Sequence, residues 1–151
     1  ISTEIPYEVE YALKIALKDW MSENCVITTA LLDDKVSYHF NPVDAWKKIK
    51  LLLPDFQYDK FDGLLIQIAL PRIYKQKPMY YIPLYHELGH FIDSHFSITQ
   101  LTMIDVPPSP QNNIQSEISH RQELFADLFA SCYVGHENGQ FLKKLVPGST
   151  S

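Results

Sequence analysis

A histidine pair flanking a glutamate is the feature of this sequence with the clearest chemistry. The segment His86-Glu87-Leu88-Gly89-His90 places two histidines four residues apart. On an α-helix, residues four apart differ by about 40° in direction, so both imidazoles can bind one Zn²⁺ ion from the same face. Glu87 lies about 100° from His86, where it can hold a water molecule without becoming a ligand. The pattern predicts two metal ligands, His86 and His90, and a general base, Glu87.

A catalytic zinc ion needs a third protein ligand and an open fourth position. The best candidate is Glu123, which opens the segment Glu-Leu-Phe-Ala-Asp and lies four residues before Asp127. On a helix these two carboxylates share a face. We expect Glu123 to bind the metal and Asp127 to accept a hydrogen bond from the ring nitrogen of a ligand histidine that does not bind the metal. The alternative interpretation is a solvated acidic stripe.

Further polar residues near these motifs leave alternatives open. Asp93, three residues after His90, is either a third ligand in a His-His-Asp site or a local hydrogen-bonding residue. His95 lies one position short of the third histidine of the metzincin pattern, which disfavours that class.

A proton donor or oxyanion donor is also needed for amide hydrolysis. His120, three residues before Glu123, is the candidate for this catalytic role, and a surface histidine near a helix start is the alternative. Tyr85 and Tyr133 are weaker candidates for the same role.

The two motifs together resemble those of a known family. HELGH, followed about thirty residues later by Glu-x-x-Ala-Asp-x-Phe-Ala, is similar to the ImmA/IrrE family of small gluzincin-type metallopeptidases. The resemblance covers roughly residues 63–134, and it departs from the family after Ala130, where Ser-Cys-Tyr-Val follows. It implies a zinc-dependent peptidase of the kind found in bacteria, phages and mobile elements and often directed at a transcriptional repressor.

Composition excludes several other classes of protein. With 151 residues, 46% hydrophobic and 21% charged, the chain is expected to form one globular domain. A net charge of −5 offers no electrostatic footprint for nucleic acid or anionic lipid. No apolar run approaches the ~20 residues of a membrane helix, so we expect a cytoplasmic protein with no direct nucleic acid and no membrane partner. Cys25 and Cys132 form no CxxC pair and are expected to be buried thiols.

Hydrophobic periodicity and turn residues predict the elements that must position the motifs. The first half is expected to hold a helix after Pro6, a hairpin of residues 25–32 and 36–40, and a helix opened by Asn41-Pro42. The second half is expected to hold a buried strand, an extended piece that could pair with substrate, the HELGH helix, a long loop and a second helix. In the same order, these five elements are expected over residues 63–70, 79–82, 83–96, 99–115 and 116–134. The core side of that second helix is expected to carry Ile118, Phe125, Leu128, Phe129 and Cys132.

These elements predict an α+β, zincin-like metallopeptidase domain, in which a small twisted sheet packs on the HExxH helix and a second helix carries the glutamate ligand. We expect a single domain over residues 1–151, with N-terminal helices and a hairpin in 1–62, a catalytic core in 63–135 and a C-terminal helix and tail in 136–151.

The expected function is zinc-dependent endopeptidase cleavage of a protein or peptide substrate. Two alternatives stay open: a non-catalytic, zinc-containing binding or sensor module, and the protease effector domain of a larger protein whose regulatory domain lies outside this chain.

Overall fold

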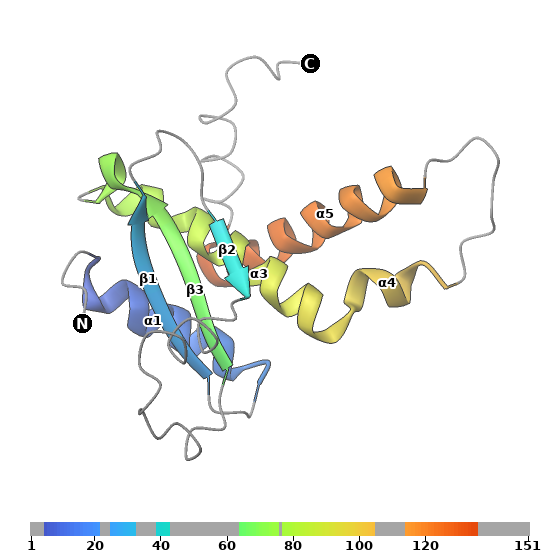
Figure 1. Cartoon of the computed structure of the whole chain (residues 1–151), viewed down its shortest axis with the longest axis horizontal. Helices are drawn as coiled ribbons and strands as arrows, with labels where there is room; N and C mark the ends of the chain where they lie inside the picture. The colour runs from blue at the N-terminus through green and yellow to red at the C-terminus, as the bar shows by residue number, and fades with distance from the viewer. Residues whose placement is uncertain are drawn as a thin grey trace, which may run out of the picture. The chain divides into compact units, whose positions relative to one another are not determined.

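The computed structural model describes residues 5–21, 25–32, 39–42, 64–75, 77–104 and 114–135. The chain divides into two compact units, Ile1–Gln76 and Lys77–Ser151. The first unit holds a small sheet with helix α1, and the second is helical (Figure 1). The chain is therefore α+β, as predicted. The strand that we grouped with the catalytic core belongs to the first unit, and the candidate site belongs to the second.

A three-stranded sheet forms the centre of the first unit. Its strands are β1 (Cys25–Leu32), β2 (His39–Pro42) and β3 (Leu64–Pro71), in the order β1-β3-β2. β3 pairs in parallel with β1 and antiparallel with β2. The apolar run predicted as a buried strand takes the central position, and its buried residues are Ile66, Ile68, Ala69 and Leu70. A central strand buried on both faces reads as a continuous apolar run, which explains why this prediction is confirmed.

The predicted hairpin is wrong. We expected residues 25–32 to pair with residues 36–40, but β1 and β2 both pair with β3 and lie on opposite sides of it. β3 replaces the local pairing, because between the two strands its backbone N–H and C=O groups find partners along both edges. Asn41 and Pro42, predicted to open a helix, end β2. The helix expected after them lies outside the described residues, as does the C-terminal helix expected after residue 136.

Helix α1 (Tyr7–Lys18) confirms the first predicted helix. Its start follows Pro6, and its buried residues are Leu13, Ala16 and Leu17, which recur at helical spacing. The helix contacts β1 within the first unit. A single 3-10 turn, η1 (Arg72–Tyr74), follows β3.

The second unit is a set of packed helices. A 3-10 turn, η2 (Pro78–Tyr81), leads directly into α3 (Ile82–Phe96), and α4 (Ile98–Thr102) and α5 (Ile114–Val134) follow. α3 and α5 lie side by side (Figure 1). The extended piece expected at residues 79–82 is wrong, because Pro78 and Pro83 both fix φ at values suited to the first turn of a helix. No sheet edge is available there for substrate pairing.

The HELGH helix has the bounds that the sequence predicts. Pro83 stands in its first turn, and the apolar residues expected to anchor it are all buried: Leu84, Leu88, Phe91 and Ile92. The helix ends at Ser97, which adopts the left-handed conformation with φ of 54°.

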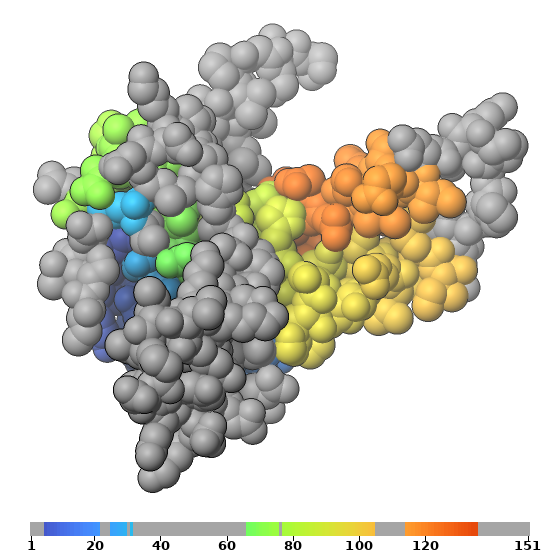
Figure 2. Space-filling view, in the orientation of Figure 1, coloured from blue at the N-terminus to red at the C-terminus, as the bar shows by residue number. Residues whose placement is uncertain are grey.

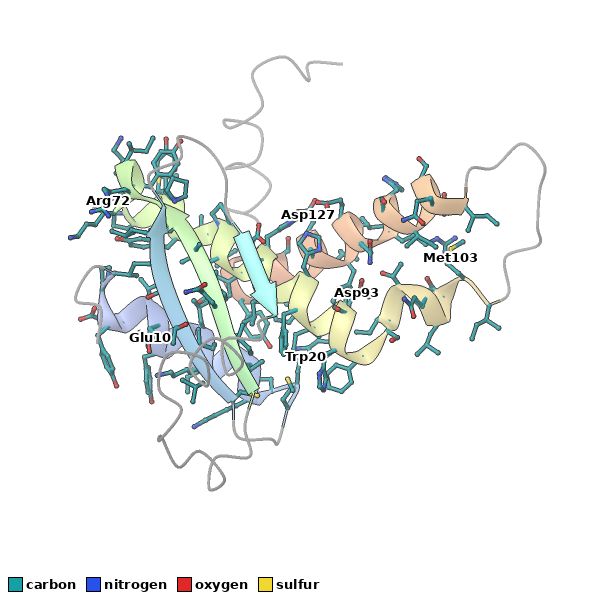
Figure 3. All side chains as sticks on the ribbon, viewed as in Figure 1. Glu10, Trp20, Arg72, Asp93, Met103 and Asp127 are labelled. Carbon is teal, nitrogen blue, oxygen red and sulfur yellow. The ribbon has the colours of Figure 1, made fainter. Side chains whose placement is uncertain are left out.

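The loop expected over residues 99–115 is wrong at both ends, because α4 extends to Thr102 and α5 starts at Ile114. Asp93 supports this arrangement. It is 2% exposed, and its Oδ1 accepts a hydrogen bond of 2.6 Å from the backbone N–H of Thr99 (Asp93 is labelled in Figure 3). That N–H belongs to the first turn of α4, so Asp93 caps α4 from α3. This is the local hydrogen-bonding role that we considered for it.

Helix α5 ends at Val134, with Gly135 at φ of 67° in the expected closing position. The face that it buries differs from the predicted one. Its buried residues are Ala126, Phe129 and Ala130, whereas Leu128 and Cys132, expected in the core, are exposed. Ala126 lies against Gly89 of α3, where the helices approach closely, and Phe129 is buried beside it, as predicted. Cys25 is only half-buried, so the prediction of two buried thiols is also wrong.

None of the helices within the described ranges combines the length and the apolar character that crossing a membrane requires.

We predict that Asp93→Ala lowers the free energy of unfolding by about 1–2 kcal/mol, because the substitution leaves the N–H of buried Thr99 without its acceptor. Urea unfolding followed by circular dichroism measures the change. Gln100→Ala, an exposed substitution on α4, is the control and should change stability by less than about 0.5 kcal/mol. Equal stability of the two variants would contradict the capping role.

Candidate metal centre

Helix α3 brings the two motif histidines onto one side of the helix. Leu84 and Leu88, on the opposite side, are fully buried, whereas the side chains of His86 and His90 are 16% and 24% exposed. Their Nε2 atoms lie 3.0 Å apart, and their rings meet edge to face at 86°. Two ring nitrogens so close point at a common centre, which is the arrangement that the i, i+4 spacing predicts.

Glu123 reaches the same centre from α5. Its Oε2 lies 3.3 Å from Nε2 of His86, and its Oε1 lies 3.5 Å from Nε2 of His90. Within the described ranges, these three residues form a group that can hold a metal ion. Each offers one ligand atom, and these atoms lie within 4.8 Å of one another. The Glu123 side chain is 63% exposed, so solvent reaches the centre from its side.

The size of this triangle fits a metal ion. In a tetrahedral zinc site with bonds of about 2.0–2.1 Å, neighbouring ligand atoms lie about 3.3 Å apart. The two Nε2 atoms are 3.0 Å apart, and the two carboxylate oxygens of Glu123 lie 3.3 Å and 3.5 Å from one ring each, so these separations are close to that value. Two imidazoles and one carboxylate are also the donor types that zinc accepts in catalytic sites. The residues present therefore fit a zinc ion held by three protein ligands.

Asp127 fixes the orientation of His86. Its Oδ1 lies 2.8 Å from Nδ1 of the ring (Asp127 is labelled in Figure 3). An ionised carboxylate can only accept, so Nδ1 donates to Asp127, and Nε2 is the ring nitrogen that faces Glu123 and His90. This is the contact that the sequence predicts for Asp127, and it prepares His86 to be a metal ligand.

The local electrostatics favour a neutral His90. Burial lowers the pKa of His90, and the adjacent His86 ring lowers it further, while the carboxylates of Glu123, Asp93 and Asp127 act in the opposite direction. A metal-binding imidazole must be deprotonated at the ligating nitrogen. Burial therefore keeps His90 in the form that binds metal.

Gly89 lets the two helices approach. A Cβ atom at this position would lie 2.9 Å from Cα of Ala126 and 3.2 Å from both its carbonyl oxygen and Cβ of Phe129. The nearest of these neighbours is backbone, so it can yield only if α5 moves. Sequence reasoning assigned no role to Gly89, although a glycine inside a helical motif, with an alanine between the two acidic residues of the partner helix, was a usable signal.

The remaining predicted site residues lie around the centre. Glu87 is partly buried on the same turn as His86. His120 is exposed on α5, one turn before Glu123. Tyr85 and Tyr133 stack on each other with ring centroids 5.9 Å apart, and burial raises the pKa of Tyr85.

Two alternatives considered for the third ligand do not join the histidines. Asp93 belongs to the cap of α4. His95 is exposed and packs beside Phe91 and Phe96, with ring centroids 5.7 and 4.8 Å away. Among the described residues, Glu123 is the carboxylate that completes the group with the two histidines.

Comparison with known proteins finds no matching family model, no similar curated protein and no similar solved structure.

We predict that Gly89→Ala weakens zinc binding at least tenfold, because the new methyl group separates α3 from α5 and draws Glu123 away from the histidines. Competition with a chelator of known affinity measures the change. Ser94→Ala, an exposed substitution on the same helix, should leave zinc affinity unchanged. Zinc affinity equal to that of the parent chain in the Gly89 variant would show that close packing does not position the ligands.

Asp127→Ala is predicted to reduce zinc affinity by about 10–100-fold, because His86 loses the acceptor that fixes its tautomer and orientation. Asp127→Asn keeps an oxygen acceptor and should lose less. The same chelator competition ranks the three proteins. If the alanine variant binds zinc as tightly as the parent chain, the contact with Nδ1 contributes nothing to the site.

Proposed function

We propose that this chain is a zinc-dependent peptidase. The observation that carries the proposal is the triangle of His86, His90 and Glu123, whose donor atoms have the spacing of a metal site and come from two adjacent helices. Glu87 stands on the same helical turn as the first ligand. A structural zinc site does not need a general base beside it, whereas a hydrolytic zinc site does.

The chemistry divides between the ion and the chain. A bound zinc ion supplies Lewis acidity, which polarises a substrate carbonyl and makes water a stronger nucleophile. Glu87 removes a proton from the attacking water while the oxygen of that water bonds to the carbonyl carbon. The carboxyl group then gives that proton to the amide nitrogen as the carbon–nitrogen bond breaks, which yields a carboxylic acid and an amine.

Two further residues support the reaction, one by orienting a ligand histidine and the other as a donor. Asp127 holds the Nδ1 proton of His86, which keeps the opposite nitrogen available as a ligand. His120 lies on the exposed side of α5, one turn from Glu123, where we place it as a donor to the developing oxyanion or to the leaving amine.

The resemblance to the ImmA/IrrE family supports a more specific proposal. Both of its motifs contribute to the triangle, because HELGH supplies the histidines and the second motif supplies Glu123 and Asp127. On this basis we propose endopeptidase cleavage of a regulatory protein such as a transcriptional repressor.

We predict that Glu87→Gln retains stoichiometric zinc but lowers peptide cleavage by about 10²–10⁴-fold, because glutamine cannot take the proton from water. The assay uses the zinc-loaded chain, a library of proteome-derived peptides and mass spectrometry to identify new termini. Metal content is measured in parallel by plasma mass spectrometry.

Glu8→Gln, an exposed carboxylate on α1, is the matched control and should cleave at the parental rate. Cleavage by the Glu87 variant at that same rate would remove Glu87 from the mechanism. If the parent chain binds zinc but cleaves no peptide, the chain is a non-catalytic zinc-containing module and the peptidase proposal fails.

A further inference from the structure

A groove lies between α4 and α5, next to the candidate metal centre. Its volume is about 410 Å³, and its apolar walls are formed by Ile98, Leu124, Phe125 and Leu128. Figure 2 shows the atoms of α4 and α5 lying against each other on the face in view. Ligand pockets commonly have volumes of about 300–1,000 Å³ and mostly apolar walls with a few polar groups. The groove therefore has the size and character of a binding site.

The groove exposes bulky apolar side chains. Leu124 is 51% exposed and Leu128 is 59% exposed, although both stand in the middle of a long helix. Single exposed leucines are ordinary, but neighbouring ones that line a common groove leave apolar area in water. An apolar occupant would remove that area from water.

The charged residues of the groove are already paired. Arg121 donates from Nε to Oε1 of Glu117 at 2.7 Å and from Nη1 to the carbonyl oxygen of Thr102 at 3.2 Å. The two opposite charges offset each other within the groove wall. The charge pattern therefore favours a neutral occupant over an acidic or basic one.

Two residues of the groove wall stand close to the proposed ligand Glu123 along α5. His120 lines the groove and lies one turn before Glu123, and Leu124 directly follows that ligand. Residues three apart on a helix have Cβ atoms about 5–6 Å apart. A side chain held in the groove thus belongs to a residue close to the peptide bond at the metal centre.

We infer that the groove between α4 and α5 binds a large apolar side chain of the substrate, of leucine or phenylalanine size, within a few residues of the bond that is cleaved. This inference rests on the proposed peptidase function and names its substrate class: polypeptides with a large apolar residue near the scissile bond.

The test compares Leu128→Glu with Leu101→Glu in the full, zinc-loaded chain. Leu101 is 60% exposed on α4 and does not line the groove, so it matches Leu128 in residue type and exposure. The peptide library reports the residues preferred around each cleaved bond. Individual peptides that differ only in leucine or aspartate at the preferred position give kcat and KM.

We expect the parent chain and Leu101→Glu to prefer a large apolar residue at one position. Leu128→Glu should lower kcat/KM for the leucine peptide about 10–100-fold, mainly through a higher KM, while leaving zinc content unchanged. A second measurement follows the leucine methyl signals of the Glu87→Gln chain by NMR during titration with N-acetyl-leucinamide, which should shift the signals of Leu124 and Leu128.

Different failures separate the two proposals. If the parent chain cleaves peptides without an apolar preference, or if both glutamate variants cleave alike, the groove inference is wrong and the peptidase proposal stands. Self-association of the parent chain that Leu128→Glu alone abolishes would assign the groove to a second copy and also overturn the inference. If no peptide is cleaved, both proposals fail.

Discussion

The close contact between α3 and α5 is the constraint on which the candidate site depends. At Gly89 the helices approach until a single methyl group would meet backbone atoms of Ala126. This approach allows side chains as short as Glu123 and Asp127 to reach histidines on the neighbouring helix, at 3.3 and 2.8 Å from His86. The small residues Gly89 and Ala126 permit this approach, while Leu124 and Leu128 of α5 line a groove with α4.

Local sequence patterns predicted the features that depend on residues close together in the sequence. The four-residue spacing of His86 and His90 places both rings on one face of any helix, and the buried Leu84 and Leu88 identify the opposite face. Glu123 and Asp127 were predictable as a pair for the same reason. The central strand was predictable because residues 64–70 form an apolar run too continuous for a half-exposed strand.

Features set by contacts between distant segments were not predictable in this way. Pairing of β1 with β3 depends on a competition between a local hairpin and a distant apolar strand, which no local pattern resolves. The buried face of α5 was predicted correctly at Phe129 but wrongly at Leu128 and Cys132, because large residues were assumed to face the core, whereas the small Ala126 meets Gly89 of α3. The cap of α4 by Asp93 also joins separate helices.

X-ray absorption spectroscopy of the zinc-loaded chain tests the central claim most directly, because it reports the atoms that surround the ion. The account predicts four nitrogen or oxygen neighbours at about 2.0–2.1 Å, with the outer-shell scattering of two imidazole rings and no sulfur. The outer-shell signal of two rings should fall to one in the His90→Ala chain. A sulfur neighbour at about 2.3 Å, or a first shell without imidazole, would contradict the account.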